Sequence, residues 1–157
     1  MSDAAAAPPV SPLAHVLFVE DSAAEMKLVN ELLTRASVQF DGHWVTTGED
    51  ALHFLHHDAG FESAPKPDII FLDLGLPRIR GEDILQHIQG IEGLKRIPVV
   101  ILSGSDFSGD VVNARDQGAI HYLVKPLTYE KLCEVVARTS RLRLKRVGED
   151  LLLQASR

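Results

Sequence analysis

Ile69-Ile70-Phe71-Leu72-Asp73 is a run of four apolar residues that ends in an acid, and this stretch decides the fold. A short, continuously apolar run is typical of a strand that helices cover on both faces, as in a parallel sheet. Three other short runs also end in polar residues: His15–Val19 before Glu20-Asp21, Val99–Leu102 before Ser103, and Tyr122–Val124 before Lys125. The carboxyl ends of parallel strands share one edge of the sheet, where open α/β sheets bind ligands. Three acids, a hydroxyl and an amine are therefore expected to converge there.

Helical periodicity fills the intervals between these runs. The predicted helices are Ala24–Ala36, one started by Thr46 with Glu49, one marked by Ile84, Leu85 and Ile88, one around Val111 and Val112 that stops at Gly118, and one capped by Thr128. The remaining strand is His43-Trp44-Val45, and Trp44 is expected to lie away from the site. Five alternations of strand and helix predict an α/β fold. We expect a doubly wound five-stranded parallel sheet of order 2-1-3-4-5 with five helices, a flavodoxin-like arrangement.

Size and composition set limits on the class of protein. The chain has 157 residues, of which 45% are hydrophobic and 24% charged, as expected for one globular domain. A net charge of −6 argues against general binding to nucleic acid or to an anionic membrane. No apolar stretch is long enough to span a bilayer, and Met1–Pro12 lacks the pattern of a secretory signal, so we expect a cytoplasmic protein. The expected organisation is a disordered tail over 1–14, a folded domain over 15–140, and a C-terminal helical extension over 141–157.

The acids at the strand ends predict phosphoryl chemistry. Glu20, Asp21 and Asp73 would repel one another unless a cation joined them, and Mg²⁺ prefers such oxygen ligands. Asp73 is the candidate nucleophile, because a carboxylate can attack phosphorus and hold an acyl phosphate. Lys125 would supply positive charge to the same group, and Ser103 could donate a hydrogen bond to a phosphoryl oxygen. The alternative is a structural carboxylate cluster or a set of helix caps, which leaves Asp73 and Lys125 without an explanation.

Four motifs close the predicted strands in order: Val19-Glu20-Asp21-Ser22, Leu72-Asp73-Leu74-Gly75-Leu76-Pro77, Leu102-Ser103-Gly104 and Tyr122-Leu123-Val124-Lys125-Pro126. Together they resemble the receiver domain of two-component response regulators. The resemblance covers residues 15–140 and implies that Asp73 accepts a phosphoryl group from a sensor histidine kinase. It also implies that Asp21, Asp73 and the backbone carbonyl of Gly75 ligate Mg²⁺, with Glu20 acting through a bound water.

The same resemblance implies a conformational switch. Ser103 would move toward the phosphoryl group and Tyr122 would turn inward, while the peptide bond between Lys125 and Pro126 would be cis. Gly75 has no side chain to shield an acyl phosphate from water, which leaves the phosphoryl lifetime open. The loop over 58–67 and the segments over 64–70 and 94–102 are similar to those of single-domain regulators paired with bacterial phytochromes, so a bacteriophytochrome is the expected kinase.

Two rival functions follow from the same residues. A phosphatase that forms an aspartyl phosphate would place a general acid two residues after the nucleophile, where this chain has Gly75. A receiver-like binding module that is never phosphorylated would be expected to have lost an acid or the lysine, and none is missing. We also expect a homodimer built on the fifth strand, the fifth helix and the C-terminal extension, whose apolar residues a small domain cannot easily cover alone. Those residues are Leu142, Leu144, Val147 and Leu151 to Leu153. The alternative is a frayed amphipathic tail that folds onto its own domain.

Overall fold

A five-stranded parallel sheet forms the centre of the molecule. The computed structural model describes residues 12–104 and 115–156. The strands are β1 (His15–Val19), β3 (Asp41–Val45), β4 (Ile69–Asp73), β5 (Val99–Ser103) and β6 (His121–Val124). Their order is β3-β1-β4-β5-β6, and each neighbouring pair is parallel. This is the predicted order 2-1-3-4-5, so the expected doubly wound, flavodoxin-like class is confirmed.

The helices in the described residues are α1 (Ala23–Arg35), α2 (Gly48–His56), α3 (Gly81–Gln89) and α5 (Tyr129–Ala137). Of these, α1, α2 and α5 begin at a side-chain cap, whereas α3 begins at Arg80 without a side-chain hydrogen bond. Ser22 and Thr128 cap α1 and α5, because their hydroxyls accept hydrogen bonds from backbone N–H groups in the first turn. The cap of α2 is Thr47, one residue after the predicted Thr46. The predicted helix around Val111 lies mostly outside the described residues.

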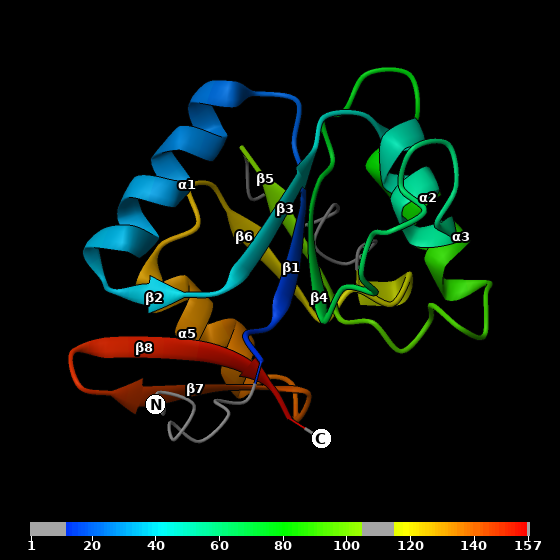
Figure 1. Cartoon of the computed structure of the whole chain (residues 1–157). Coiled ribbons are helices and arrows are strands. Elements are labelled where there is room, and N and C mark those ends of the chain that lie inside the picture. Colours follow the sequence, from blue (N-terminus) through cyan, green and yellow to red (C-terminus); the bar gives the residue numbers. More distant parts are fainter. Residues whose placement is uncertain (1–11, 105–114, 157) are drawn as a thin grey trace.

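Helices cover both faces of the sheet (Figure 1). α1 and α5 lie on one face, while α2 and α3 lie on the other. Alternate strand residues divide between two apolar cores, so Val16 and Phe18 of β1 belong to the core of α1 and α5, and Leu17 and Val19 to the core of α2. All five residues of β4 are buried. The continuous apolar run therefore does indicate burial on both faces.

The C-terminal segment is a β-hairpin, so the predicted helical extension over 141–157 is wrong. β7 (Leu142–Val147) pairs antiparallel with β8 (Asp150–Ala155), and β8 pairs parallel with the short strand β2 (Val38–Gln39). The physical reason is a period of two: Leu142 and Leu144 alternate with basic residues, as suits a strand with one covered face. Gly148 has φ of +63° in the turn, a conformation that glycine adopts at little steric cost.

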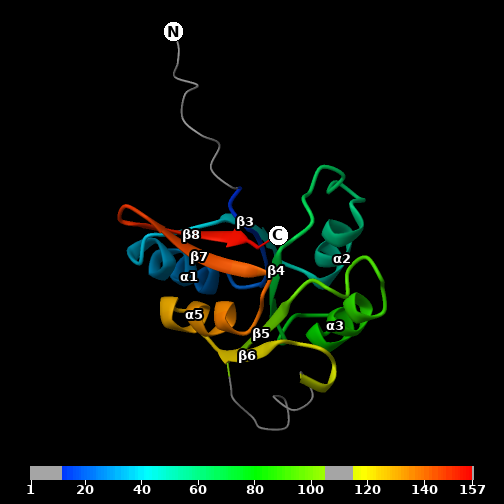
Figure 2. The same ribbon diagram turned by 90° about the horizontal axis from the view of Figure 1, so that it is seen from below.

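The hairpin lies near the start of β1, on the side of the sheet that α1 and α5 cover (Figure 2). Leu142, Leu151 and Leu153 are buried in the same core as α1 and α5. Leu13 forms a β-bridge with Gln154, and the backbone N–H of Ala14 donates to the Leu153 carbonyl at 2.8 Å. The expected disordered tail over 1–14 is therefore wrong at its end, because Leu13 and Ala14 are ordered. Residues 1–11 of that tail lie outside the described part. Among the helices of the described residues, none has the length and apolar character to cross a bilayer.

Candidate phosphoryl-acceptor site

The acids predicted from β1 and β4 meet at the carboxyl edge of the sheet. Val19 of β1 aligns with Leu72 of β4, so the residues that follow each strand arrive at the same level. Glu20, Asp21 and Asp73 each place a carboxylate oxygen within 4.8 Å of the others. Glu20 and Asp73 are each 6% exposed, whereas Asp21 faces solvent. Adjacent parallel strands thus bring together acids that lie far apart in the sequence.

Lys125 bridges the two buried acids. Its Nζ donates a hydrogen bond to Glu20 Oε1 at 2.5 Å and lies 3.3 Å from Asp73 Oδ2. The lysine side chain is 17% exposed, and the two acid side chains are 8% exposed. A single ammonium therefore faces two buried carboxylates, with Asp21 as a third acid at the solvent side.

The electrostatics of these groups reflect burial and mutual contact. Burial raises the pKa of Glu20, and the charge of Asp73 adds to this, against the hydrogen bonds from Lys125 and the Ser22 N–H. Burial by itself would lower the pKa of Lys125, but its hydrogen bond to Glu20 and the charge of Asp73 outweigh that effect and raise the pKa. The site thus carries more negative charge than its lysine offsets. Carboxylates clustered in this way are the oxygen donors that a hard divalent cation prefers.

Two glycines shape the chain after β4. The backbone N–H of Gly75 donates to Asp73 Oδ1 at 2.9 Å, which fixes that carboxylate. A Cβ on Gly81 would lie 2.8 Å from the Asp73 carbonyl oxygen and 2.9 Å from the Leu74 Cα, closer than side chains approach backbone. The start of α3 can therefore pack against this segment because residue 81 is glycine. A Cβ on Gly75 would lie 3.5 Å from Asp73 Oδ1, an ordinary contact, so a side chain fits there.

The residues predicted for the switch lie on the neighbouring strands. Ser103 ends β5 opposite Val124 of β6, and its carbonyl accepts a hydrogen bond from the Lys125 N–H at 2.7 Å. Tyr122 is 7% exposed and belongs to the core on the side of α2 and α3. The peptide bond between Lys125 and Pro126 is cis. The backbone of the β5 end and the lysine-bearing loop are thus directly joined.

Two residues near the site were missed by sequence reasoning. The indole Nε1 of Trp44 donates to the Glu20 carbonyl at 2.6 Å, so the expectation that Trp44 lies away from the site is wrong. The signal was available, because β3 is the neighbour of β1 in the predicted sheet order. Lys131 of α5 donates through Nζ to the carbonyls of Val124 at 2.5 Å and Pro126 at 3.2 Å. No motif marked this lysine, which holds the loop on both sides of Lys125.

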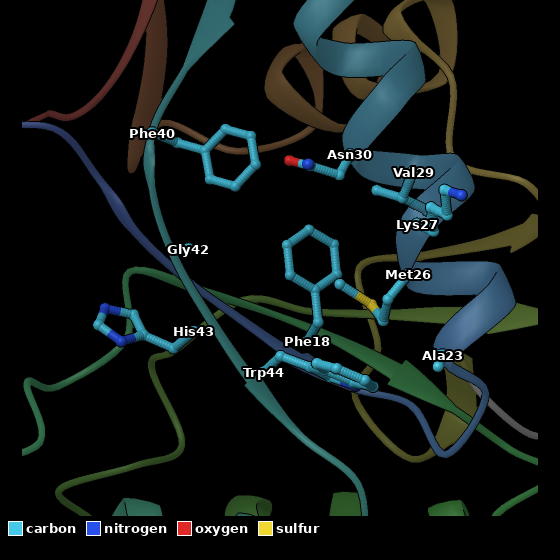
Figure 3. A pocket seen from close by; sticks show the side chains of 10 residues that line it. All are labelled: Phe18, Ala23, Met26, Lys27, Val29, Asn30, Phe40, Gly42, His43 and Trp44. Atoms are coloured by element: carbon cyan, nitrogen blue, oxygen red, sulfur yellow. The ribbon is translucent and has the colours of Figure 1, made fainter.

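An apolar hollow of about 370 Å³ lies beside the acids, between α1 and the edge strand β3 (Figure 3). Its lining includes the large apolar side chains of Phe18, Met26, Phe40 and Trp44. The hollow does not contain the carboxylates, but Trp44 borders it and also contacts the Glu20 backbone. Trp44 therefore connects the lining of the hollow to the backbone of Glu20.

Comparison with known proteins decides the family. The sequence profile described as the response regulator receiver domain matches residues 16–137. The chain belongs to this family. Response regulator Rcp1 of Synechocystis sp. is 35% identical to this receiver protein over 121 residues, which cover 77% of this chain and 82% of Rcp1.

Solved structures agree with this assignment. The Mn²⁺-bound form of Rcp1 is similar with a TM-score of 0.67 at 34% identity, covering 78% of this chain and 88% of the other. The phosphorylated cyanobacterial phytochrome response regulator RcpA has a TM-score of 0.68 at 32% identity, with the same coverage. The bacteriophytochrome response regulator RtBRR has a TM-score of 0.75 at 29% identity and covers 87% of this receiver protein and 82% of its own chain.

Proposed function

We propose that this receiver protein accepts a phosphoryl group on Asp73 from a sensor histidine kinase in an Mg²⁺-dependent reaction. The observation that carries the proposal is the arrangement of Lys125 between two buried carboxylates, 2.5 Å from Glu20 and 3.3 Å from Asp73. A buried acid at a strand end with a fixed cation beside it is suited to covalent phosphoryl transfer. The similarity to phosphorylated RcpA supports the same chemistry.

The transfer can be written from the residues present. One carboxylate oxygen of Asp73 attacks the phosphorus of a phosphohistidine, the P–N bond breaks, and the imidazole leaves with the electron pair. Because Gly75 N–H holds Oδ1, we assign the attack to Oδ2, which faces Lys125. Lys125 then stabilises the negative charge on the phosphoryl oxygens. Ser103 donates a hydrogen bond to one of those oxygens.

The donor set suits Mg²⁺. Asp21, Asp73 and the Gly75 carbonyl would hold the ion, and Glu20 would act through a water. When bound, the ion supplies positive charge to the phosphoryl oxygens. The support is the cluster of acids within 4.8 Å and the raised pKa of buried Glu20, together with the similarity to Mn²⁺-bound Rcp1.

Phosphorylation would be transmitted through Ser103 and Tyr122. The new group adds a charge of about −1.5 to −2 at the end of β4, and Ser103 would turn toward it. Movement of Ser103 would open space into which the Tyr122 side chain can turn. The new position of Tyr122 would favour one of two conformations of the surface made by β6, α5 and the helix predicted around Val111. Lys131, bound to the loop carbonyls, would carry the change into α5.

The partners follow from the relatives and from the surface. Phytochrome response regulators are among the similar structures, which supports a bacteriophytochrome as the kinase. A homodimer through β6, α5 and the hairpin stays part of the proposal. The expectation that the domain cannot cover the hairpin leucines is wrong for most of them, because Leu142 and Leu151 to Leu153 are buried within the chain. The apolar surface left for a partner is Leu144 and Val147, the latter 49% exposed.

Phosphotransfer tests the proposal directly. Purified protein is incubated with Mg²⁺ and either acetyl phosphate or a candidate kinase, and the acyl phosphate is measured on an intact-mass spectrum. Wild type is expected to gain one phosphoryl group and Asp73→Asn none. Asp58→Asn, a change at an exposed loop acid, is the matched control and is expected to be modified like wild type. Equal modification of Asp73→Asn and wild type would contradict the assignment.

A further inference from the structure

A second cluster of metal-ligating side chains lies at the opposite end of the sheet. His15 Nδ1, Asp41 Oδ2 and His43 Nε2 converge, and the three residues offer ligand atoms within 4.8 Å of one another. His15 is the first residue of β1, and Glu20 follows its last residue. At about 3.3 Å per strand residue, the two clusters are about 16 Å apart along the strand. The second cluster is therefore separate from the phosphoryl-acceptor site.

The strand geometry dictates this convergence. Asp41 and His43 lie two residues apart on β3, so they project from the same face of the sheet. The parallel register sets His15 opposite Asp41 and Leu17 opposite His43. The imidazole of His43 also packs against the ring of Phe54 in α2, with 5.5 Å between the ring centroids. The three ligand atoms are therefore held by two paired strands and a helix.

The distances match those within a metal coordination sphere. His15 Nδ1 lies 3.2 Å from His43 Nε2 and 3.5 Å from Asp41 Oδ2. Ligands about 2.0–2.1 Å from a tetrahedral ion are separated by about 3.4 Å. When His15 Nδ1 carries a hydrogen, it has only that one hydrogen to donate to two neighbours, His43 Nε2 and Asp41 Oδ2. A cation would instead accept an electron pair from each of the three atoms.

A second histidine pair provides an internal contrast. His56 Nε2 and His87 Nε2 lie 2.7 Å apart with their rings edge to face. Within the described residues, no carboxylate or third imidazole joins that pair in a ligand cluster. A contact between two histidines is therefore not enough by itself to indicate a metal site. The cluster on β1 and β3 differs from this pair because it also contains a carboxylate.

We propose that His15, Asp41 and His43 bind a divalent transition-metal ion, with Zn²⁺ as the best match and solvent completing the coordination. Two imidazoles and a carboxylate are ligands that Zn²⁺ accepts, while Mg²⁺ prefers an all-oxygen set. The Asp41 side chain is 60% exposed and that of His15 31%, which leaves a path for the ion and for water. Bound metal would tie the edge strand β3 to β1.

The affinity experiment titrates the full-length protein with Zn²⁺ against a chromogenic chelator, in excess Mg²⁺ so that the carboxylate site at the other end is occupied by the harder ion. His43→Gln and Asp41→Asn are each expected to weaken Zn²⁺ binding by at least about tenfold. His87→Gln is the matched control and is expected to bind within about twofold of wild type. Wild-type affinity in His43→Gln, or an equal loss in His87→Gln, would overturn the proposal.

Nitrogen NMR identifies the ligands without any substitution. In long-range proton–nitrogen spectra, one equivalent of Zn²⁺ is expected to shift the ring nitrogens of His15 and His43. His53, which is exposed and contacts Asp58, should keep its shifts. Unchanged His15 and His43 resonances at one equivalent of Zn²⁺ would refute the site, and this readout does not depend on any variant folding.

Discussion

Replacing Lys125 by methionine removes the cation between Glu20 and Asp73 while keeping most of the aliphatic chain. The lysine side chain is 17% exposed and the acid side chains are 8% exposed. Water can therefore do little to solvate the two carboxylates once the ammonium is gone. Removing one partner of a buried ion pair costs about 3–5 kcal/mol. We take the lower end of this range, about 3 kcal/mol, because the site borders solvent at the exposed Asp21. For a domain of this size, the midpoint of thermal unfolding should fall by about 6–12 °C in EDTA.

The loss should depend on pH in a direction that the structure fixes. The pKa of Glu20 is already raised from 4.5, mainly by burial, and loss of the lysine hydrogen bond would raise it further. A carboxyl with a raised folded-state pKa favours folding below its unfolded pKa and loses that contribution as pH rises through the folded pKa. The stability deficit of Lys125→Met should therefore be smallest below pH 4.5 and should grow as pH rises. Millimolar Mg²⁺ should reduce this stability deficit, because the ion offsets the negative charge of the same carboxylates.

Urea unfolding followed by circular dichroism measures the effect, in EDTA and in Mg²⁺. Lys95→Met is the matched control, because Lys95 also forms a short ion pair, 2.8 Å from Glu92, but on the surface with side chains 43% and 82% exposed. That control should lose no more than about 0.5 kcal/mol. Equal losses in the two variants, or a Lys125→Met deficit that does not change with pH, would refute the reasoning.

Four further outcomes follow from the site and the hairpin. Calorimetry should show a larger loss of Mg²⁺ affinity in Asp21→Ala than in Glu20→Ala, and the reverse order would exchange their roles as direct and water-mediated ligands. Gly81→Ala should lower stability by about 1–3 kcal/mol in urea unfolding, because its Cβ would meet the Asp73 carbonyl at 2.8 Å. Gly75→Leu should fold normally and keep its acyl phosphate several-fold longer in a decay assay, since the added side chain would shield Asp73; an unchanged lifetime would count against shielding. Light scattering should give a dimer for the full chain, and a monomer both with and without beryllofluoride would exclude it.

The central sheet could be predicted from the sequence because its signals are local. Each buried strand is a continuous apolar run, each run ends in a polar residue, and parallel strands put those ends on one edge. Glu20, Asp21 and Asp73 therefore come together as expected, with Lys125 beside them. The strand order followed from the family resemblance and general topology rules.

The errors lie where a local pattern was ambiguous or a contact was not local. The period of two in β7 spans only six residues, too short a stretch for the pattern alone to separate a strand from the expected helical extension. β2 is two residues long and exists through its pairing with β8, which no local pattern announces. The predicted sheet order already sets β3 beside β1, and this was the available signal for the contact of Trp44 with the Glu20 carbonyl. The contacts of Lys131 with two loop carbonyls depend on a long side chain and require the assembled fold.

The small sheet of β2, β8 and β7 also sets the order in which the chain can fold. Val38 pairs with Leu151, so most of the chain lies between two residues that must meet. Pairings this distant in sequence form slowly, whereas β1, β3 and β4 are close neighbours along the chain. During synthesis the segment after α1 must wait, with its backbone hydrogen bonds unmade, until β8 has left the ribosome. Until the hairpin is in place, the core of α1 and α5 lacks Leu142, Leu151 and Leu153, so a chain without the hairpin would leave apolar residues of that core exposed, a state prone to aggregation.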